Sequence, residues 1–359
     1  MKEINTLLKG KFLSKFKIVK PFFEEQMPYT LEVHPTYVCN YSCEFCIDEF
    51  LKNVPSVNGM DINCDGKSQL TQENMDTIIE GCLELNIKGI ILSGGGDPPI
   101  NPNTLYLVEQ ANKNGISIGM FTNGFILNDK TIPKYIDNLT FLRFSFDSFS
   151  AKEYAKTKGV SEKAYYKVLE NINKCATYKR THKSKCKVGI DFIIQPHNVH
   201  LIQNIYRKAC DLNLDYVQFC DCVIPGYEFT DHQKEKILDE VDQCLTIKYN
   251  EENPWNDTEG KSLPEVVYEP AQIENTINCQ NCRMKNYIFM VGGDGGVRPC
   301  PHLARHDEMK YGDINNQSLK EIWDDRPDQL RYFLYEYCRF REQNRILEGL
   351  EHIEHEEIL

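Results

Sequence analysis

Three cysteines stand close together in the segment VHPTYVCNYSCEFCIDEF, which covers residues 33–50. Cys39, Cys43 and Cys46 have the spacing C-x3-C-x2-C. Thiolates are soft ligands, so three of them on one loop can hold an iron-sulfur cube and leave one iron open for reaction. Zinc is the alternative metal, but it favours four ligands in paired C-x2-C spacing, which this triplet does not have. The spacing therefore favours a cluster with one open iron.

A second cysteine group lies near the carboxyl end of the chain. Cys279 and Cys282 form a C-x2-C pair in NCQNCRMKN, Cys300 follows a Gly-rich turn in GGVRPCPH, and Cys338 stands apart in YEYCRFRE. A C-x2-C pair on a turn is a common metal-binding unit. A structural zinc site is one interpretation of this group, and a second iron-sulfur cluster is the other.

Short β-like segments that alternate with helical stretches are expected to position these thiols. The expected strands are 29–34, 89–93, 117–122, 142–147, 188–194 and 216–220, and the expected helices are 71–85, with Thr71 as N-cap, 103–114, 152–177 and 200–212. Six β/α units in series indicate a parallel sheet covered by helices, and they are too few for a closed eight-stranded barrel. The predicted fold class is α/β, a partial (β/α)6 TIM-like barrel with its chemistry at the carboxyl ends of the strands.

The charge balance and the apolar pattern limit the classes of partner that can be expected. The chain of 359 residues has 41 basic and 53 acidic residues, a net charge of -12, so a nucleic-acid backbone is not an expected partner. No stretch approaches the ~20 apolar residues that span a bilayer, and no stable membrane association is expected. The count of 15 cysteines without a signal sequence favours a reducing cytoplasm, where clustered cysteines ligate metal.

Shifts in composition divide the chain into four expected parts. Residues 1–24 form an amino-terminal extension, 25–225 a core domain, 226–278 an acidic connecting segment read as a helix and then a loop-rich stretch, and 279–359 a small α+β extension. Within that extension, YIFMVGGDGGVRPCPH predicts a β-hairpin around a Gly-Asp-Gly-Gly turn. Residues 318–350 are expected to be helical.

The cysteine triplet, with Phe45 directly before the last cysteine, resembles the signature of the radical S-adenosylmethionine (SAM) enzymes. Four later segments resemble that family in order: SGGGDPPINP at 93–102, TNG at 122–124, RFSFDS at 143–148 and IDFIIQPHN at 190–198. The family has Glu where this chain has Asp97 after its three glycines. The resemblance implies a SAM-binding 4Fe-4S cluster and a set of cofactor-binding residues, which are Phe45, Gly94, Gly95, Gly96, Asp97, Asn123, Ser145, Asp147 and Ile194.

The carboxyl-terminal part resembles the SPASM and twitch extensions of a radical SAM subfamily. The likeness lies in the hairpin, the Gly-Asp-Ile segment and LKEIW. It implies an auxiliary 4Fe-4S cluster held by Cys279, Cys282, Cys300 and Cys338, with His302 or a substrate group as the alternative fourth ligand. Only one cysteine follows LKEIW, so a twitch-like extension with one cluster is expected.

The resemblance implies reductive cleavage of SAM to a 5'-deoxyadenosyl radical, with an electron from a partner such as flavodoxin or ferredoxin. The expected substrate is a small polar molecule, a sugar, cyclitol or nucleotide-linked compound, that is oxidised or epimerised. Cys220 and Cys222, at the end of the sixth strand, are candidate hydrogen donors, with inert packing as the alternative. His197, Tyr227 and Arg298 are expected nearby.

Two other functions stay open at this stage. Relatives with such extensions also mature ribosomal peptides by thioether formation, crosslinking or epimerisation. A non-catalytic metal-binding scaffold is the alternative of another class. The remaining cysteines are expected to be packing residues: Cys64, Cys82, Cys175, Cys186, Cys210 and Cys244.

Overall fold

The computed structural model describes residues 28–53, 56–57, 60–61, 66–249, 263–270 and 282–327. Within these residues one sheet of ten strands has the order β12-β11-β10-β1-β4-β5-β6-β7-β8-β9. Its strands are β1 (Thr30–Val33), β4 (Gly89–Leu92), β5 (Ser117–Thr122), β6 (Phe141–Ser145), β7 (Lys187–Ile194), β8 (Tyr216–Asp221), β9 (Glu265–Glu269), β10 (Ile288–Val291), β11 (Gly296–Arg298) and β12 (Gly312–Asp313). The two short strands β2 (Ser56–Val57) and β3 (Met60–Asp61) pair separately.

All six predicted strands are confirmed, and they pair in parallel in chain order from β1 to β8. The alternation of fully buried and partly buried side chains along β7 explains why this segment forms a strand. Ile190, Phe192 and Ile194 are fully buried in the hydrophobic core under the helices, whereas Asp191 and Ile193 on the other face are only partly buried. One face of the sheet is therefore covered, and the other carries polar side chains.

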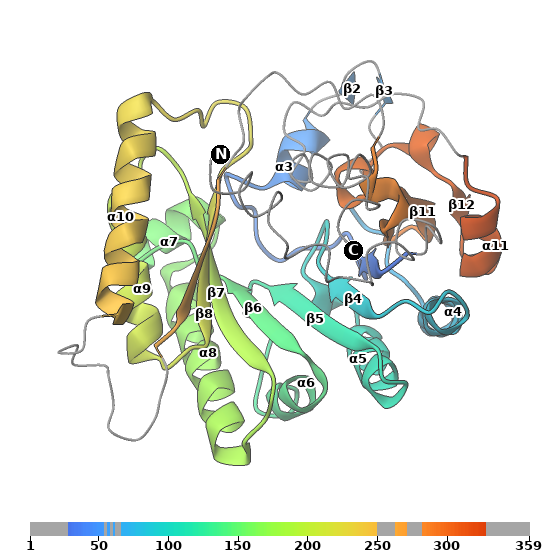
Figure 1. Ribbon diagram of the computed structural model, residues 1–359, viewed down its shortest axis with the longest axis horizontal. Coiled ribbons are helices and arrows are strands. Elements are labelled where there is room, and N and C mark those ends of the chain that lie inside the picture. Colours follow the sequence, from blue (N-terminus) through green and yellow to red (C-terminus); the bar gives the residue numbers. More distant parts are fainter. Residues whose placement is uncertain are drawn as a thin grey trace, which may run out of the picture.

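The described helices lie mostly along one side of the sheet, and α3 lies apart from the others, above the strands in the view (Figure 1). They are α3 (Ile47–Lys52), α4 (Gln72–Glu84), α5 (Thr104–Lys113), α6 (Ile132–Asn138), α7 (Ala151–Lys158), α8 (Glu162–His182), α9 (Ile202–Asp211), α10 (Asp231–Tyr249) and α11 (Leu319–Asp324). Short 3-10 turns span Pro98–Ile100, Val199–Leu201, Met284–Asn286, Pro301–Leu303 and Asp307–Met309. Thr71 caps α4 as predicted, since its hydroxyl accepts a hydrogen bond from the Asn74 backbone N–H. None of the described helices is long and apolar enough to cross a membrane.

The single helix predicted over 152–177 is wrong, because the structure divides it into α7 and α8. Gly159 ends α7 with φ of 63° in the left-handed region. A Cβ at this position would come 2.6 Å from the Ser42 carbonyl oxygen. The break thus follows from both the backbone and a close approach to the cysteine-bearing loop.

Four strands extend the sheet beyond the six parallel strands predicted for the core: β9 on one side and β10, β11 and β12 on the other. In the connecting segment, the predicted helix is α10, but β9 follows it and pairs in parallel with β8. The predicted hairpin is confirmed as β10 and β11, and β10 also pairs in parallel with β1. The carboxyl-terminal extension is therefore continuous with the main sheet. Of the predicted helix over 318–350, α11 lies within the described residues, and the part beyond residue 327 lies outside them, as do residues 1–24.

Candidate active site at the carboxyl ends of the strands

The cysteine triplet lies on the loop between β1 and α3, and Cys46 is the N-cap residue of α3. Two backbone hydrogen bonds tie this loop to the end of α7. Ser42 N–H donates to the Lys158 carbonyl at 3.1 Å, and Glu44 N–H donates to the Thr157 carbonyl at 3.0 Å. We call residues 37–48 the cysteine loop.

The three thiols of the cysteine loop are free and act on one another electrostatically. Burial, with a contribution from Cys46, raises the pKa of Cys39 to about 11, and burial with contributions from Cys46 and Cys39 raises the pKa of Cys43 to about 12. In the described part of the chain no three His, Cys, Asp or Glu side chains gather closely enough to hold a single metal ion. A cube binds each thiolate at a different iron, so its ligands need not meet at one point. The soft donor set fits such a cube.

The glycine-rich segment after β4 packs directly on the cysteine loop. Asp97 N–H donates to the Val38 carbonyl at 3.1 Å. A Cβ on Gly96 would overlap the Val38 backbone, and a Cβ on Gly95 would overlap the side chain of Arg305. A side chain at Gly96 would push the two backbones apart, and one at Gly95 would displace the Arg305 and Tyr37 side chains.

Asp97 is a buried carboxylate with one oxygen atom that has no hydrogen-bond partner among the described residues. It is 3% exposed, and its Oδ1 accepts hydrogen bonds from the Thr122 hydroxyl and the Asn123 N–H, both at 2.8 Å. Its Oδ2 has no hydrogen-bond partner among the described residues. Burial raises the pKa of Asp97 to about 6, although these hydrogen bonds favour the ionised form. Such a group can accept a hydrogen bond from an ammonium group.

Lys158 joins the cysteine loop to the end of β6, and sequence reasoning missed it. Its Nζ is paired with Asp147, donates to the Ser145 hydroxyl at 2.7 Å and lies 4.8 Å from the Phe45 ring centroid. Burial alone would lower the pKa of Lys158, but the charges of Asp147 and Cys43 outweigh burial and raise it. Because the sequence predicted a single helix over 152–177, only the position of Lys158 directly before Gly159 could have indicated a special role.

A polar row continues across β7, β8 and β9 on the face that the helices do not cover. Asp191 is the register partner of Ser145, and Asp191 Oδ1 lies 3.5 Å from Cys220 Sγ. Glu269 Oε2 lies 3.8 Å from the same sulfur atom. Burial raises the pKa of Asp191 to about 6, and burial together with Asp191 and Glu269 raises that of Cys220. Cys220 is therefore a neutral thiol at pH 7.

Other predicted site residues lie around this row. Asn123 Nδ2 donates to the Asn40 side chain of the cysteine loop at 2.8 Å. Ile194 is fully buried in the hydrophobic core, and Cys222 is 6% exposed, with its pKa raised by burial to about 11. Next to Ile194, both amide atoms of the fully buried Gln195 side chain have no hydrogen-bond partner among the described residues.

The predicted neighbours of the site separate into two groups. His197 Nε2 lies 3.9 Å from Glu44 Oε1, and the Tyr227 hydroxyl donates to the Glu44 carbonyl at 3.4 Å, so both residues lie against the cysteine loop. Arg298 was expected with them, which is wrong. It is 1% exposed and enclosed by Asp294 and Asp307 in the carboxyl-terminal hairpin region.

The second cysteine group is described in part. Cys300 precedes the 3-10 turn at Pro301–Leu303, and Cys282 precedes the turn at Met284–Asn286. Burial raises the pKa of Tyr311, and the charges of Cys282 and Cys300 add to this effect. Cys279 and Cys338 lie outside the described residues, as does Cys64. The five described cysteines predicted as packing residues are confirmed as buried: Cys82, Cys175, Cys186, Cys210 and Cys244.

Two family descriptions match the chain. The Radical SAM superfamily matches residues 33–209, which include the cysteine loop and the strands from β4 to β7. The SPASM family, an iron-sulfur cluster-binding domain, matches residues 282–346, which include the hairpin. The first match implies that the chain uses SAM and a 4Fe-4S cluster. The second match implies auxiliary iron-sulfur binding.

One curated relative and two solved structures show how far the likeness extends. The dTDP-4-amino-4,6-dideoxy-D-glucose ammonia-lyase of Streptomyces venezuelae is 24% identical over 196 residues, which are 54% of this chain and 38% of that protein. Streptococcus suis SuiB bound to S-adenosylmethionine is 14% identical, with a TM-score of 0.61 over 87% of this chain and 67% of its own. Native anSMEcpe with bound AdoMet and Cp18Cys peptide is 16% identical, with a TM-score of 0.57 over 83% and 80%. The two structures share the fold.

Proposed function

Because this chain belongs to the radical SAM superfamily and carries a SPASM iron-sulfur cluster-binding domain, we propose that it abstracts a hydrogen atom from a small polar substrate and oxidises or epimerises that carbon. The substrate class is a sugar, cyclitol or nucleotide-linked compound. The observation that carries the proposal is the polar row of Ser145, Asp191, Cys220 and Glu269, which leads from the cysteine-loop side of the sheet across its uncovered face.

The proposed roles near the cysteine loop follow from chemistry and burial. Cys39, Cys43 and Cys46 hold the SAM-binding cluster, which together with SAM supplies a 5'-deoxyadenosyl radical. The buried Oδ2 of Asp97, which has no hydrogen-bond partner among the described residues, would receive the SAM ammonium group, and the adjacent glycines let this segment pack closely on the cysteine loop. Ser145 would present its hydroxyl to the polar end of the cofactor, and the buried Asp147 and Lys158 side chains hold that hydroxyl in place.

Further cofactor contacts are proposed from position. Phe45, beside the Lys158 ammonium group, packs next to the cluster, while Asn123, at the end of β5, borders the nucleoside. Ile194, at the end of β7, would do so only through its backbone, because its side chain is fully buried in the hydrophobic core. Cys279, Cys282, Cys300 and Cys338 hold one auxiliary cluster, as in a twitch-like extension. A small electron-transfer protein such as flavodoxin or ferredoxin supplies the reducing electron.

Different residues of the polar row would act in epimerisation and in oxidation. In epimerisation, the Cys220 S–H bond breaks and its hydrogen atom forms a new C–H bond on the opposite face of the substrate radical. The resulting sulfur radical then takes one electron from the reductant and one proton from solvent. In oxidation of an alcohol carbon, Asp191 would take the hydroxyl proton of the substrate radical, and a cluster held by the second cysteine group would supply an acceptor for the remaining electron. Because the pKa of Asp191 is raised to about 6, its carboxylate is ionised but basic at pH 7.

The substrate class is supported by a relative as well as by the site. The Streptomyces venezuelae protein is named for a dTDP-linked amino sugar, and its likeness covers 54% of this chain. Carboxylates and a neutral thiol suit hydroxyl and amine groups. The name of that relative also favours elimination of ammonia as a second candidate reaction.

Anaerobic turnover in D2O tests the proposal. The protein is incubated with SAM, reductant and either dTDP-linked neutral and amino sugars or a peptide pool, and 5'-deoxyadenosine and product masses are measured. We expect sugars to stimulate 5'-deoxyadenosine formation. A product one mass unit heavier indicates epimerisation, a product two units lighter indicates oxidation, and loss of ammonia indicates elimination. Stimulation by peptides alone would contradict the substrate class and favour peptide maturation.

Two cysteine variants locate the hydrogen donor. Cys220→Ala is expected to abolish deuterium incorporation during epimerisation, while substrate-dependent 5'-deoxyadenosine formation continues. Cys222→Ala is the matched control, since this thiol is buried two residues away on the same segment. Loss of incorporation in the Cys222 variant alone would contradict the assignment of Cys220.

A further inference from the structure

The carboxyl-terminal hairpin lies beside the start of the cysteine loop. Strands β1 and β10 are parallel, with Val33 opposite Val291, and His34 N–H continues the pairing by donating to the Val291 carbonyl at 2.9 Å. Parallel strands in register end at the same edge of a sheet. The segments that follow them, the cysteine loop and the turn at residues 292–295, therefore leave the sheet side by side.

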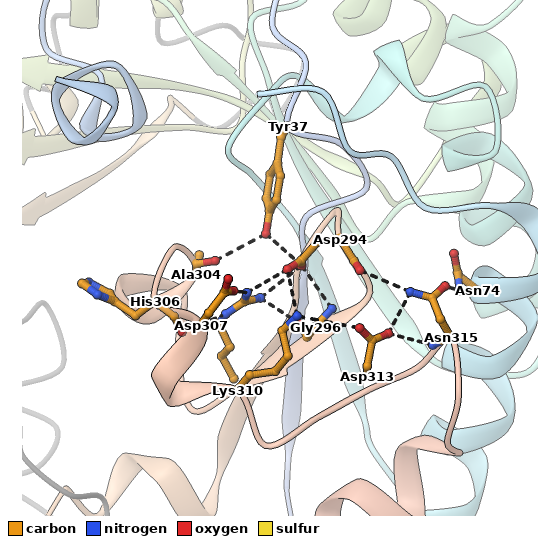
Figure 2. Close-up of polar contacts among 11 residues, drawn as sticks. Tyr37, Asn74, Asp294, Gly296, Ala304, His306, Asp307, Lys310, Asp313 and Asn315 are labelled. Carbon is orange, nitrogen blue, oxygen red and sulfur yellow. Dashed lines mark hydrogen bonds and ion pairs between the residues drawn. The ribbon is translucent and has the colours of Figure 1, made fainter. Parts of the chain in front are cut away.

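Tyr37, two residues before the first cysteine, points into this hairpin. Its hydroxyl lies 3.2 Å from Asp294 Oδ1 and 3.4 Å from the Ala304 carbonyl oxygen, as Figure 2 shows. The side chain is almost fully buried, and a Cβ on Gly292 would overlap its hydroxyl oxygen. The amino-terminal end of the cysteine loop is thus seated against the hairpin turn.

Asp294, which accepts the hydrogen bond from the Tyr37 hydroxyl, is held in place by Arg298. Arg298 Nη2 donates to Asp294 Oδ2 at 2.8 Å, and Nη1 donates to Asp294 Oδ1 at 3.1 Å. Burial alone would raise the pKa of Asp294, but the hydrogen bonds and charge of Arg298 outweigh burial and hold it below its ordinary value. Arg298 Nη2 also bonds Asp307 at 2.9 Å. A two-point pair of this kind holds the carboxylate in one orientation.

Arg305 reaches the other end of the cysteine loop. Its Nε and Nη2 lie 2.7 Å and 2.6 Å from Oδ1 of Asp48, which is two residues after the third cysteine. Its guanidinium carbon lies 3.5 Å from the centroid of the Tyr37 ring, so the same side chain stacks on the amino-terminal end. The Arg305 and Asp48 side chains are only 1% and 11% exposed, which limits solvent screening of their charges.

We propose that Arg305 is a positioning residue for the SAM-binding cluster, because it fixes both ends of the cysteine loop from the carboxyl-terminal domain. We call Tyr37, Asp48 and Arg305 the loop brace. Gly95 belongs to the same contact, since a Cβ there would overlap Arg305 and Tyr37. The brace acts on the spacing of the three thiols and on the glycine-rich segment together. The inference rests on the proposed role of the triplet as cluster ligands.

Spectroscopy of the full-length holoenzyme tests the brace. Arg305→Gln, Arg305→Lys, Asp48→Asn and the double variant Asp48→Asn with Arg305→Gln are reconstituted anaerobically. Iron content, melting temperature, the change that SAM causes in the electron paramagnetic resonance spectrum of the reduced protein, and the SAM dissociation constant are measured. Arg326→Gln is the matched control, since it removes a guanidinium group from the same domain that stacks 3.6 Å from the Trp323 ring.

We expect Arg305→Gln to weaken SAM binding by about tenfold or more and to alter the SAM-dependent spectrum. Substitutions of residues that orient metal ligands commonly have effects of this size. Asp48→Asn should act alike, and the double variant should lose about as much as either single variant, because both remove one interaction. Arg305→Lys should restore part of the affinity, since it keeps the charge but not the planar stack. Arg326→Gln should behave as the wild type.

Wild-type spectra and SAM affinity in folded Arg305→Gln would overturn the brace. If Arg305→Gln does not fold, Arg305→Lys and Asp48→Asn test the brace instead. Unchanged SAM binding in both of these variants would also overturn the brace. Additive losses in the double variant would contradict action through Asp48. A wild-type protein without any SAM-dependent spectral change would instead refute the proposed function, which keeps the two failures distinct.

Discussion

At the scale of single residues, the site combines charges that are buried together. Lys158 and Asp147 are paired, and their side chains are 1% and 0% exposed. Burying one charge without the other would cost several kcal/mol, so each requires its partner. The types and spacing of Cys39, Cys43 and Cys46 could be interpreted from the sequence, whereas this pair could not, because eleven positions separate residues that only the packing of α7 on β6 brings together.

Removal of the Lys158 charge should destabilise the protein. Lys158→Met leaves the Asp147 carboxylate buried without its partner, and we expect a loss of about 3–5 kcal/mol in the free energy of unfolding. Urea unfolding followed by circular dichroism measures it. Lys174→Met is the control, because its pairs with Asp129 and Glu170 are at the surface and should contribute less than about 1 kcal/mol. Equal losses in the two variants would refute the buried pair.

Asp97 should make stability depend on pH. Its pKa is raised from 3.8 to about 6, so folding favours the neutral form, and this contribution is complete below the unfolded value and is lost as the pH rises through about 6. Between about pH 4 and pH 7 the wild type should lose roughly 3 kcal/mol relative to Asp97→Asn. Urea unfolding of both proteins, metal-free and without SAM, measures the difference. Parallel stability curves would show that Asp97 is not desolvated as the structure indicates.

At the scale of elements, the cysteine loop is held on three sides. The end of α7 bonds its backbone, the glycine-rich segment after β4 packs against Val38, and the hairpin contacts Tyr37. Strand segments were predictable because short apolar runs between turn signals are local features. The division between α7 and α8 was missed, since helical periodicity continues through Gly159, although glycine followed by Ser161 is also a pattern of helix end and restart.

Replacing Gly159 should destabilise the protein more than its positive φ alone would predict. Gly159→Ala and Gly115→Ala both place alanine at a positive φ, 63° and 73°, which costs about 1–2 kcal/mol each. A Cβ at Gly115 meets nothing within 4 Å, whereas one at Gly159 lies 2.6 Å from the Ser42 carbonyl oxygen. We therefore expect Gly159→Ala to lower the melting temperature further and to reduce reconstituted iron. Equal effects would mean that the contact with the cysteine loop adds nothing.

At the scale of the whole molecule, the two matched domains share one sheet. Strand β10 of the extension pairs with β1, and β9 of the connecting segment pairs with β8. Neither pairing is predictable from local sequence, because each joins residues that are distant in the chain and each strand is only four or five residues long. The polar row of Asp191, Cys220 and Glu269 was missed in part for the same reason, since Glu269 reaches the site only through β9.

Iron content should separate the two cysteine groups. The wild type should hold about eight irons per chain, as two cubes. The double variant Cys282→Ala with Cys300→Ala should keep about four irons and the SAM-dependent spectral change, because the cysteine loop retains its own ligands. Iron and sulfide analysis with electron paramagnetic resonance measures this. Loss of all iron, or of none, would contradict an auxiliary cluster at these residues.

The central claim is that the cysteine loop holds a cluster with which SAM reacts, and reductant-dependent formation of 5'-deoxyadenosine tests it most directly. Anaerobically reconstituted wild type and the Cys244→Ala control, which changes only a buried packing residue, are compared with Cys43→Ala. We predict 5'-deoxyadenosine from the wild type and the control only when reductant is present, and none from Cys43→Ala. Undiminished 5'-deoxyadenosine from Cys43→Ala, or zinc in place of iron on the wild-type loop, would contradict the account.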